Sequence, residues 1–135
     1  MTKQHQIYKC EICGNIVEVL HSGAGQLVCC GQAMKLIEEK DKDEGKEKHL
    51  PVMEILPADD CKVSDGVKIK IGEIPHPMEE NHYIEWVEIK TNDNKTGKKF
   101  LNPGDVPEIN FHTRAKILEI RVYCNIHGLW KLLIA

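Results

Sequence analysis

The sequence predicts a mainly β protein in which a small metal-bound module precedes a β-sandwich. Four cysteines fall between Tyr8 and Ile37, in a stretch with little apolar mass. All six prolines follow His49, and helix interiors tolerate proline poorly. The same region contains short runs of alternating or β-branched residues bounded by turn signals. Together these features favour a sandwich over a helical bundle.

Composition and charge change along the chain and suggest three segments. Residues 1–37 form the four-cysteine module, in which a metal must substitute for a hydrophobic core. Residues 38–48 are charged apart from Gly45, which is typical of a solvated linker. Residues 49–135 form the sandwich, and the 135-residue chain has room for one such domain beside the module.

The strands of the sandwich are predicted by residue patterns. Apolar residues alternate with lysines over 67–71, directly after a turn signal at Asp65-Gly66. Residues 83–90 are rich in aromatic and β-branched types, as in a strand inside a sandwich. Near the end, one parity holds Leu118, Ile120, Val122 and Cys124. A strand there would direct the thiol of Cys124 toward the same interior as its apolar neighbours.

Several classes of function and location are disfavoured. The net charge is -3 and there is no basic cluster interleaved with aromatics, so we expect no nucleic-acid partner. No apolar run is long enough for a membrane span, and the first residues lack the apolar core of a signal peptide. The cysteine spacing suits metal ligation better than a disulfide framework. We therefore expect a cytoplasmic protein without a membrane partner.

The four cysteines of the module are spaced for a tetrathiolate metal site. Cys10 and Cys13 form a knuckle in which both sulfurs can face one ion, and Gly14 permits the tight turn behind it. Cys29 and Cys30 would complete the site. Because directly adjacent cysteines cannot both form relaxed knuckles, we expect distorted sulfur–metal–sulfur angles. The residue types are compatible with structural zinc and with iron.

A second set of potential ligands lies in the rest of the chain: His49, His76, His82, Cys124 and His127. Five ligands exceed what a tetrahedral zinc ion uses, so they favour an octahedral metal, iron first, with one open position. The six-residue separation of His76 and His82 requires a loop that folds back, which Pro75 and Pro77 would stiffen. Each histidine taken alone is more often an ordinary residue than a ligand.

Motifs in both segments resemble a known family. YKCEICGNIVEV and VCCGQAMKLI resemble the small iron-binding protein desulforedoxin. EKHLP, HPMEENHYIEW and YCNIHGLW resemble superoxide reductase, and nearly the whole chain resembles desulfoferrodoxin, its two-iron form. The resemblance implies an immunoglobulin-like β-sandwich and two irons per chain. The first iron would be held by the four cysteines of the module.

The resemblance also implies a site and an activity. The catalytic iron would have Cys124 as its axial thiolate and four equatorial histidines, His49, His76, His82 and His127. Its sixth position would face solvent, where superoxide accepts one electron and two protons and leaves as hydrogen peroxide without forming dioxygen. An external donor such as rubredoxin would reduce the iron again. A homodimer is implied by the resemblance alone.

Two residues beside His49 carry further expectations. A ferrous ion with one thiolate and neutral imidazoles keeps a formal charge of about +1, so it attracts the anionic substrate locally. Lys48 is the candidate for an additional cation, and Glu47 matches the family residue that can occupy the sixth position of the ferric ion. The alternative is that both residues merely end the charged linker.

The remaining cysteine and aromatic residues receive no catalytic role. We assign no function to Cys61, we expect His5, His21 and His112 to be solvated, and we expect Trp86 and Trp130 to pack near the metal. Two other functions compete with superoxide reduction. One is a non-catalytic iron electron-transfer protein, and the other is a zinc-ribbon adaptor with a partner-binding sandwich.

Overall fold

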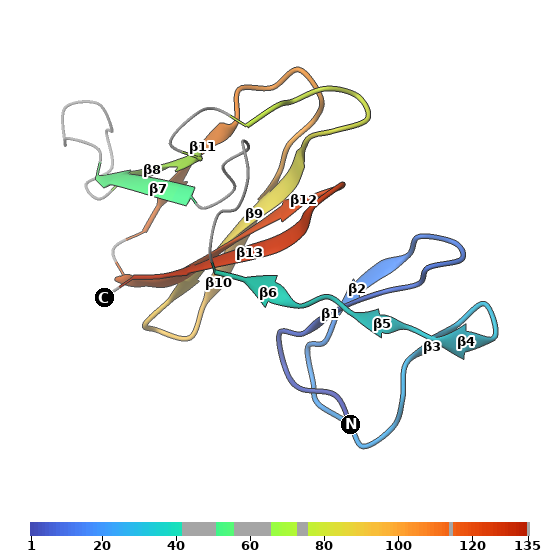
Figure 1. Ribbon diagram of the computed structural model, residues 1–135. Helices are drawn as coiled ribbons and strands as arrows, with labels where there is room; N and C mark the ends of the chain where they lie inside the picture. Colours follow the sequence, from blue (N-terminus) through green and yellow to red (C-terminus); the bar gives the residue numbers. More distant parts are fainter. Residues whose placement is uncertain (42–50, 56–65, 73–75, 114, 135) are drawn as a thin grey trace. The chain divides into compact units, whose positions relative to one another are not determined.

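The computed structural model of the protein describes residues 1–41, 51–55, 66–72, 76–113 and 115–134. These residues form strands and turns, which confirms the mainly β prediction (Figure 1). The chain divides into two compact units, Met1–Glu38 and Glu39–Ala135. Within the described residues no helix is long and apolar enough to cross a membrane.

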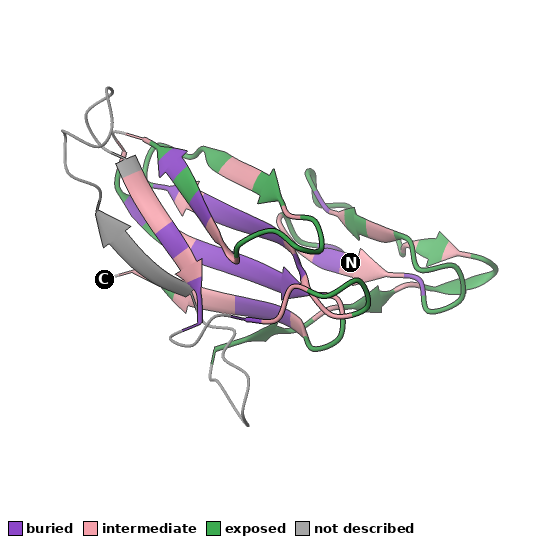
Figure 2. Cartoon of the chain, turned by 90° about the horizontal axis from the view of Figure 1, so that it is seen from above, coloured by how far each residue is buried: buried purple, intermediate pink, exposed green. Residues whose placement is uncertain are grey.

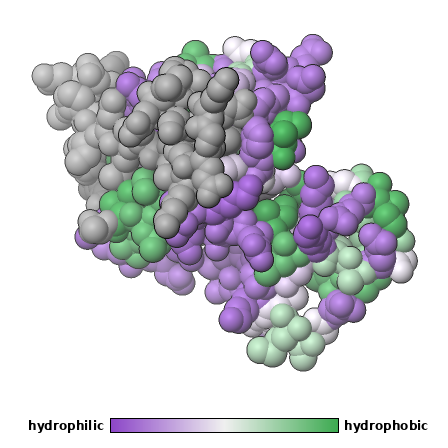
Figure 3. Space-filling view, in the orientation of Figure 1, coloured by the Kyte–Doolittle hydropathy of each residue, from purple (hydrophilic) through white to green (hydrophobic). Residues whose placement is uncertain are grey.

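The N-terminal unit contains two small sheets and very little core. The three-stranded sheet has the order β2-β1-β5, and the two-stranded sheet is a β3-β4 hairpin. The strands are β1 Ile7–Lys9, β2 Ile16–Glu18, β3 Val28–Cys29, β4 Gln32–Ala33 and β5 Lys35–Leu36. Ile12, Leu20 and Val28 are exposed, and Figure 3 shows hydrophobic residues reaching the surface. Since so little apolar area is buried, this unit depends on a metal for its stability.

The second unit is a sandwich of two sheets, as the sequence predicts. The larger sheet has the order β10-β9-β12-β13-β6 and the smaller has the order β11-β8-β7. The larger sheet contains β6 Glu39–Lys40, β9 Ile84–Thr91, β10 Thr96–Phe100, β12 Ile117–Cys124 and β13 Gly128–Leu133. The smaller sheet contains β7 Pro51–Ile55, β8 Gly66–Ile71 and β11 Glu108–His112.

The core lies between the two sheets, where the central strands in Figure 2 are largely buried. Ile69 and Ile71 of β8 are fully buried, which confirms the alternating pattern over 67–71. The strand predicted over 83–90 is β9, shifted by one residue. Full burial of an isoleucine side chain contributes about 1.5–3 kcal/mol to stability, so these strands dominate the stability of the sandwich.

The predicted parity of the last long strand is wrong at one position. Ile120, Val122 and Cys124 are fully buried as expected, but Leu118 is 39% exposed and Ile117 is buried in its place. The pairing of β12 with β9 changes register between Ile117 and Glu119, as a β-bulge does. A bulge adds one residue to a strand and so reverses the faces on one side of it.

Strand β6 consists of Glu39 and Lys40 and pairs in parallel with β13. The sequence pattern alone predicts that both residues belong to the charged linker. Glu39 lies 3.7 Å from Arg121 and 3.7 Å from Lys131, measured between charged atoms. The ammonium group of Lys40 lies 4.6 Å from the centre of the Trp130 ring. These contacts give partners to two charged side chains that a sequence pattern alone assigns to solvent.

The outer face of the larger sheet contains a buried ion pair. Arg121 and Glu88 retain only 4% and 5% side-chain exposure, and Nη2 of Arg121 lies 2.6 Å from Oε1 of Glu88. Nε of Arg121 donates a second hydrogen bond of 2.7 Å to the same oxygen. Lys98 approaches the other carboxylate oxygen at 3.2 Å. The two central strands β9 and β12 therefore each carry a buried charge that is stabilised by the opposite charge on the other strand.

Candidate metal centres

The first knuckle follows directly from β1. The carbonyl of Cys10 accepts a 2.9 Å hydrogen bond from Gly14 N–H, and Gly14 has a φ of 83°, which favours glycine. The N–H of Cys13 points at the sulfur of Cys10 at 3.5 Å. The short turn thus directs both sulfurs to one side, as the two-residue spacing predicts.

The adjacent cysteines lie in the β3-β4 hairpin. Cys29 ends β3, and the two-residue loop is Cys30-Gly31, with φ values of 53° and 76°. Positive φ at both central residues is the pattern of a type I′ turn, in which a residue with a Cβ carries some strain. Because Cys29 is extended and Cys30 is left-handed, their side chains can reach the same point despite being neighbours in sequence.

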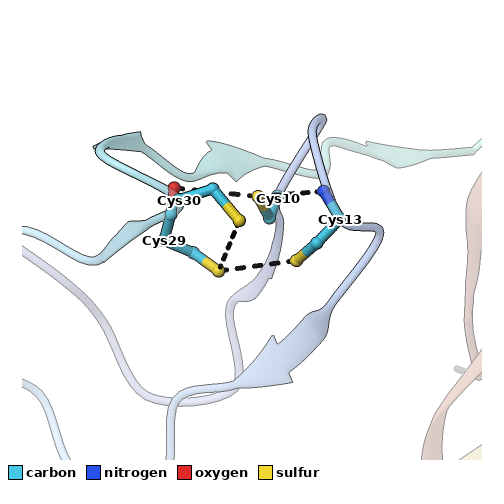
Figure 4. A group of neighbouring side chains, drawn as sticks. All are labelled: Cys10, Cys13, Cys29 and Cys30. Carbon is cyan, nitrogen blue, oxygen red and sulfur yellow. Dashed lines mark hydrogen bonds between the residues drawn. The ribbon is translucent and has the colours of Figure 1, made fainter.

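The structure brings the four sulfurs of the module together, and Figure 4 shows the side chains converging from the two segments. All four lie within 4.8 Å of one another. The sulfurs of Cys13 and Cys29 are 3.5 Å apart, and those of Cys29 and Cys30 are 3.9 Å apart. A tetrahedron with metal–sulfur bonds of about 2.3 Å has edges of about 3.8 Å, so this cluster fits a tetrathiolate metal site.

The pKa values of these cysteine thiols differ. The pKa of Cys10 is lowered to about 6, chiefly because the backbone N–H of Cys13 donates to its sulfur, although burial opposes this effect. The pKa of Cys30 is raised to about 12, mainly by its hydrogen bond with Cys13 and then by that with Cys29. The thiols of this cluster thus differ in how readily they lose their protons, and metal binding, which requires thiolates, releases those protons.

The second cluster is formed by His76, His82, Cys124 and His127, whose potential ligand atoms all lie within 4.8 Å of one another. The ring centres of His76 and His82 are 5.0 Å apart with an angle of 83° between the rings. Those of His82 and His127 are also 5.0 Å apart, at 70°. The described residues therefore contain a His/Cys metal site in the sandwich.

His76 and His82 reach this site because the segment before β9 folds back, as the sequence analysis requires. Glu79 and His82 exchange two backbone hydrogen bonds of 2.9 and 3.1 Å, which closes a tight turn. Nδ1 of His76 lies 2.8 Å from the carbonyl oxygen of Pro77. This carbonyl can only accept a hydrogen bond, which favours a proton on Nδ1 and leaves the buried Nε2 as the ring nitrogen available to a metal.

Cys124 and His127 lie at the turn between β12 and β13. Cys124 is fully buried, and its sulfur lies 3.8 Å from Nδ1 of His127. Gly128, with a φ of 92°, pairs with Cys124 across the hairpin. Nζ of Lys40 donates a 2.7 Å hydrogen bond to the carbonyl of His127, so strand β6 also holds this turn.

Four residues discussed in the sequence analysis cannot be placed relative to these two clusters. His49, Glu47, Lys48 and Cys61 lie outside the described residues, so their expected roles remain predictions. Conversely, Asn125 is not among the predicted site residues, although its side chain forms hydrogen bonds with the backbone on both sides of His82. Its position between two potential ligands was the available signal.

Two family models match the chain. The desulfoferrodoxin model matches residues 41–132, and the model of the desulfoferrodoxin N-terminal domain matches residues 2–37. The chain is 53% identical over 131 residues to a desulfoferrodoxin homolog of Archaeoglobus fulgidus, covering 97% of this chain and 98% of that protein. It is 52% identical over 131 residues to the desulfoferrodoxin of Nitratidesulfovibrio vulgaris, with the same coverage of each chain.

Solved structures share the fold. The superoxide reductase from Treponema pallidum superposes with a TM-score of 0.75 at 25% identity, covering 94% of this chain and 96% of that one. The one-iron superoxide reductase from Giardia intestinalis has a TM-score of 0.51 at 30% identity. That match covers 66% of this chain and 98% of the Giardia chain.

Proposed function

Because this chain belongs to the desulfoferrodoxin family, we propose that it is a superoxide reductase. In this reaction one superoxide ion takes up one electron and two protons and becomes hydrogen peroxide, and no dioxygen is formed. The electron comes from an external one-electron donor. The reaction detoxifies superoxide under oxidative stress.

The cluster of His76, His82, Cys124 and His127 is the observation that carries this proposal. It lies in the unit whose fold is shared with solved superoxide reductases. Three imidazoles and one thiolate are ligands that suit a redox-active transition metal. We propose His49 as the fourth histidine, which would leave one octahedral position open for superoxide.

We propose that both metals are iron, one in each cluster. Bound iron would supply one-electron redox chemistry at the His/Cys site, and the thiolate of Cys124 would raise the electron density on that iron. The protein residues orient and shield this centre. Pro77 fixes the ring of His76 through Nδ1, and the sandwich core excludes water from the sulfur of Cys124.

Glu47 and Lys48 complete the proposed active site. They precede His49 directly, so they would lie near the open position if His49 is a ligand. Lys48 would attract superoxide to the site by its charge. Glu47 would supply a carboxylate within reach of the open position.

We also propose an electron donor, an assembly and a cellular location for this protein. We propose a rubredoxin-like protein as the electron donor and a homodimer as the assembly, both in line with the family resemblance. The cytoplasm is the proposed location, because the cysteines at positions 10, 13, 29, 30 and 124 form no disulfides and need a reducing environment to stay available for metals.

Metal analysis combined with pulse-generated superoxide kinetics tests the proposal. The reduced protein should contain two irons per chain and should convert superoxide to peroxide in one-to-one proportion without evolving dioxygen. Dioxygen evolution would indicate a dismutase instead. Two iron spectra without peroxide formation would support a non-catalytic electron carrier, and zinc in both sites would support an adaptor.

A further inference from the structure

Asn125 connects the two segments that carry the His/Cys ligands. Its Oδ1 accepts a 2.9 Å hydrogen bond from the N–H of Tyr83, and its Nδ2 donates a 3.1 Å hydrogen bond to the carbonyl of Asn81. Its own N–H also donates to the carbonyl of Tyr83 at 3.2 Å. Since Asn81 and Tyr83 flank His82, the three bonds bracket that ligand on both sides.

The orientation of the Asn125 amide is determined by its partners. The N–H of Tyr83 can only donate and the carbonyl of Asn81 can only accept, so the oxygen must face the first and the nitrogen the second. An amide is the short side chain that offers both groups at once. Alanine would lose both bonds, and leucine would lose them while keeping a similar volume.

The regular pairing of β12 with β9 is interrupted just before Asn125 and its hydrogen bonds. The register of β12 against β9 changes between Tyr123 and Cys124, so the sheet ladder does not continue evenly into the ligand turn. Asn125 lies directly after this irregularity and bonds across 42 residues of sequence to Tyr83. The hydrogen bonds of Asn125 therefore connect the two ligand-bearing segments at the point where the regular backbone pairing of the strands is interrupted.

We propose that Asn125 is a positioning residue that fixes His82 relative to Cys124 and His127 and so preforms the metal centre. The inference rests on the proposed function in that it concerns the same site. It does not require catalysis, because the positioning acts on any metal that the cluster binds. Partners that orient metal ligands in this way typically change metal affinity by about 10- to 100-fold.

The experiment compares wild type with Asn125→Ala and Asn125→Leu, each loaded with cobalt(II) as the metal probe. Release of cobalt from the His/Cys site to a competing chelator should be about 10- to 100-fold faster in both variants. The thiolate-to-cobalt absorption band should broaden. In the iron-loaded protein, the backbone amide of Tyr83 should lose protection from hydrogen exchange while amides in the middle of β12 stay protected.

Asn110→Ala is the matched control, because Asn110 is exposed on β11 of the smaller sheet. It should release cobalt at the wild-type rate. Wild-type release rates and spectra in both Asn125 variants would overturn the positioning role. If the alanine variant does not fold, the leucine variant decides, since it preserves the side-chain volume.

Failure of this inference is distinguishable from failure of the proposed function. A wild-type protein that binds cobalt tightly but yields no peroxide from superoxide in its iron form would refute the reductase proposal alone. A wild-type protein that is an active reductase, with variants that retain cobalt equally well, would refute the role of Asn125 alone.

Discussion

Cys124 has no exposed surface, and its sulfur lies 3.8 Å from a ring nitrogen of His127. A sulfur in this setting meets three requirements for a metal ligand. It is close to another ligand, shielded from solvent and fixed by a strand on each side of the turn. At the scale of single residues, it is the side chain on which the proposed chemistry depends most.

Replacing Cys124 with serine should abolish superoxide reduction even where iron is retained. A serine oxygen donates less electron density to a metal than a thiolate does, so we expect the one-electron reduction of superoxide to become unfavourable. Absorption spectroscopy should show loss of the thiolate-to-iron band of the His/Cys site while the bands of the four-cysteine site remain, and pulse radiolysis should show no peroxide. Cys61→Ser is the control and should retain both signals, whereas an active Cys124→Ser protein would contradict the axial role.

Lys48→Ala should lower the second-order rate constant for superoxide by up to about tenfold and flatten its dependence on ionic strength. The physical reason is the loss of a cation close to the proposed open position. Lys42→Ala removes the same charge from the same run of sequence and should have a smaller effect. Equal rates for wild type and the Lys48 variant would remove this residue from the mechanism.

The residues that could be predicted from sequence are those whose role depends on local spacing. The Cys10–Cys13 knuckle and the fold-back between His76 and His82 are of this kind. The left-handed conformation of Cys30 and the clamp made by Asn125 depend on backbone geometry and on partners far away in sequence. No periodicity or spacing reveals the conformation of Cys30, and the position of Asn125 between Cys124 and His127 does not identify the backbone groups that its side chain binds.

At the scale of elements, the larger sheet depends on charge pairing at its outer face as well as on its core. Glu119 of β12 lies 3.0 Å from Lys131 of β13 and 3.6 Å from Lys90 of β9. Burial alone would raise the pKa of Glu119. The hydrogen bond from Lys131 and the charges of Lys131, Lys90 and Arg121 outweigh that effect and lower the pKa.

The stabilising effect of Glu119 should therefore disappear in acid. A carboxyl group with a lowered pKa in the folded state stabilises the protein fully above the ordinary glutamate pKa of about 4.3 and loses this effect as pH falls through the folded value. At pH 7, Glu119→Gln should cost about 1 kcal/mol.

Denaturant unfolding of wild type and Glu119→Gln across pH 3 to 7 measures this effect as a difference between the two proteins. Loss of metal in acid affects both proteins alike and cancels in the comparison. A difference that stays constant over the whole range would show that the carboxylate charge contributes nothing to the stability of the sheet.

Some strands could be predicted from the sequence and others could not. The alternation that predicts β8 is correct because both of its inward isoleucines are fully buried. The bulge in β12 and the short strand β6 were not predictable. A bulge depends on pairing with another strand, and a run of charged residues has no periodicity that distinguishes a paired strand from a linker.

At the scale of the whole molecule, the two units obtain their stability in different ways. The sandwich has a continuous hydrophobic core, whereas the N-terminal unit depends on its tetrathiolate site. Loss of a ligand from that site should therefore unfold the first unit without unfolding the second.

Cys10→Ser tests this independence. The variant should contain one iron per chain instead of two and should lose the circular dichroism of the first unit. Its rate of superoxide reduction should stay within about threefold of wild type, because the one-iron superoxide reductase from Giardia intestinalis matches over 98% of its own length but only 66% of this chain. Loss of activity together with loss of the first iron would show that the second unit requires the first.

The buried pair of Arg121 and Glu88 also limits how this protein can evolve. Removing either partner takes away the shortest hydrogen bonds of a buried charge and leaves it a longer contact, Lys98 at 3.2 Å from Glu88 or Glu39 at 3.7 Å from Arg121. We expect a cost of about 1–3 kcal/mol, while the total stability of a domain is only about 5–15 kcal/mol. A substitution at one position thus removes part of the stability of the sandwich unless the other position changes too. Among descendants of this sequence, the two positions should be inherited or exchanged together.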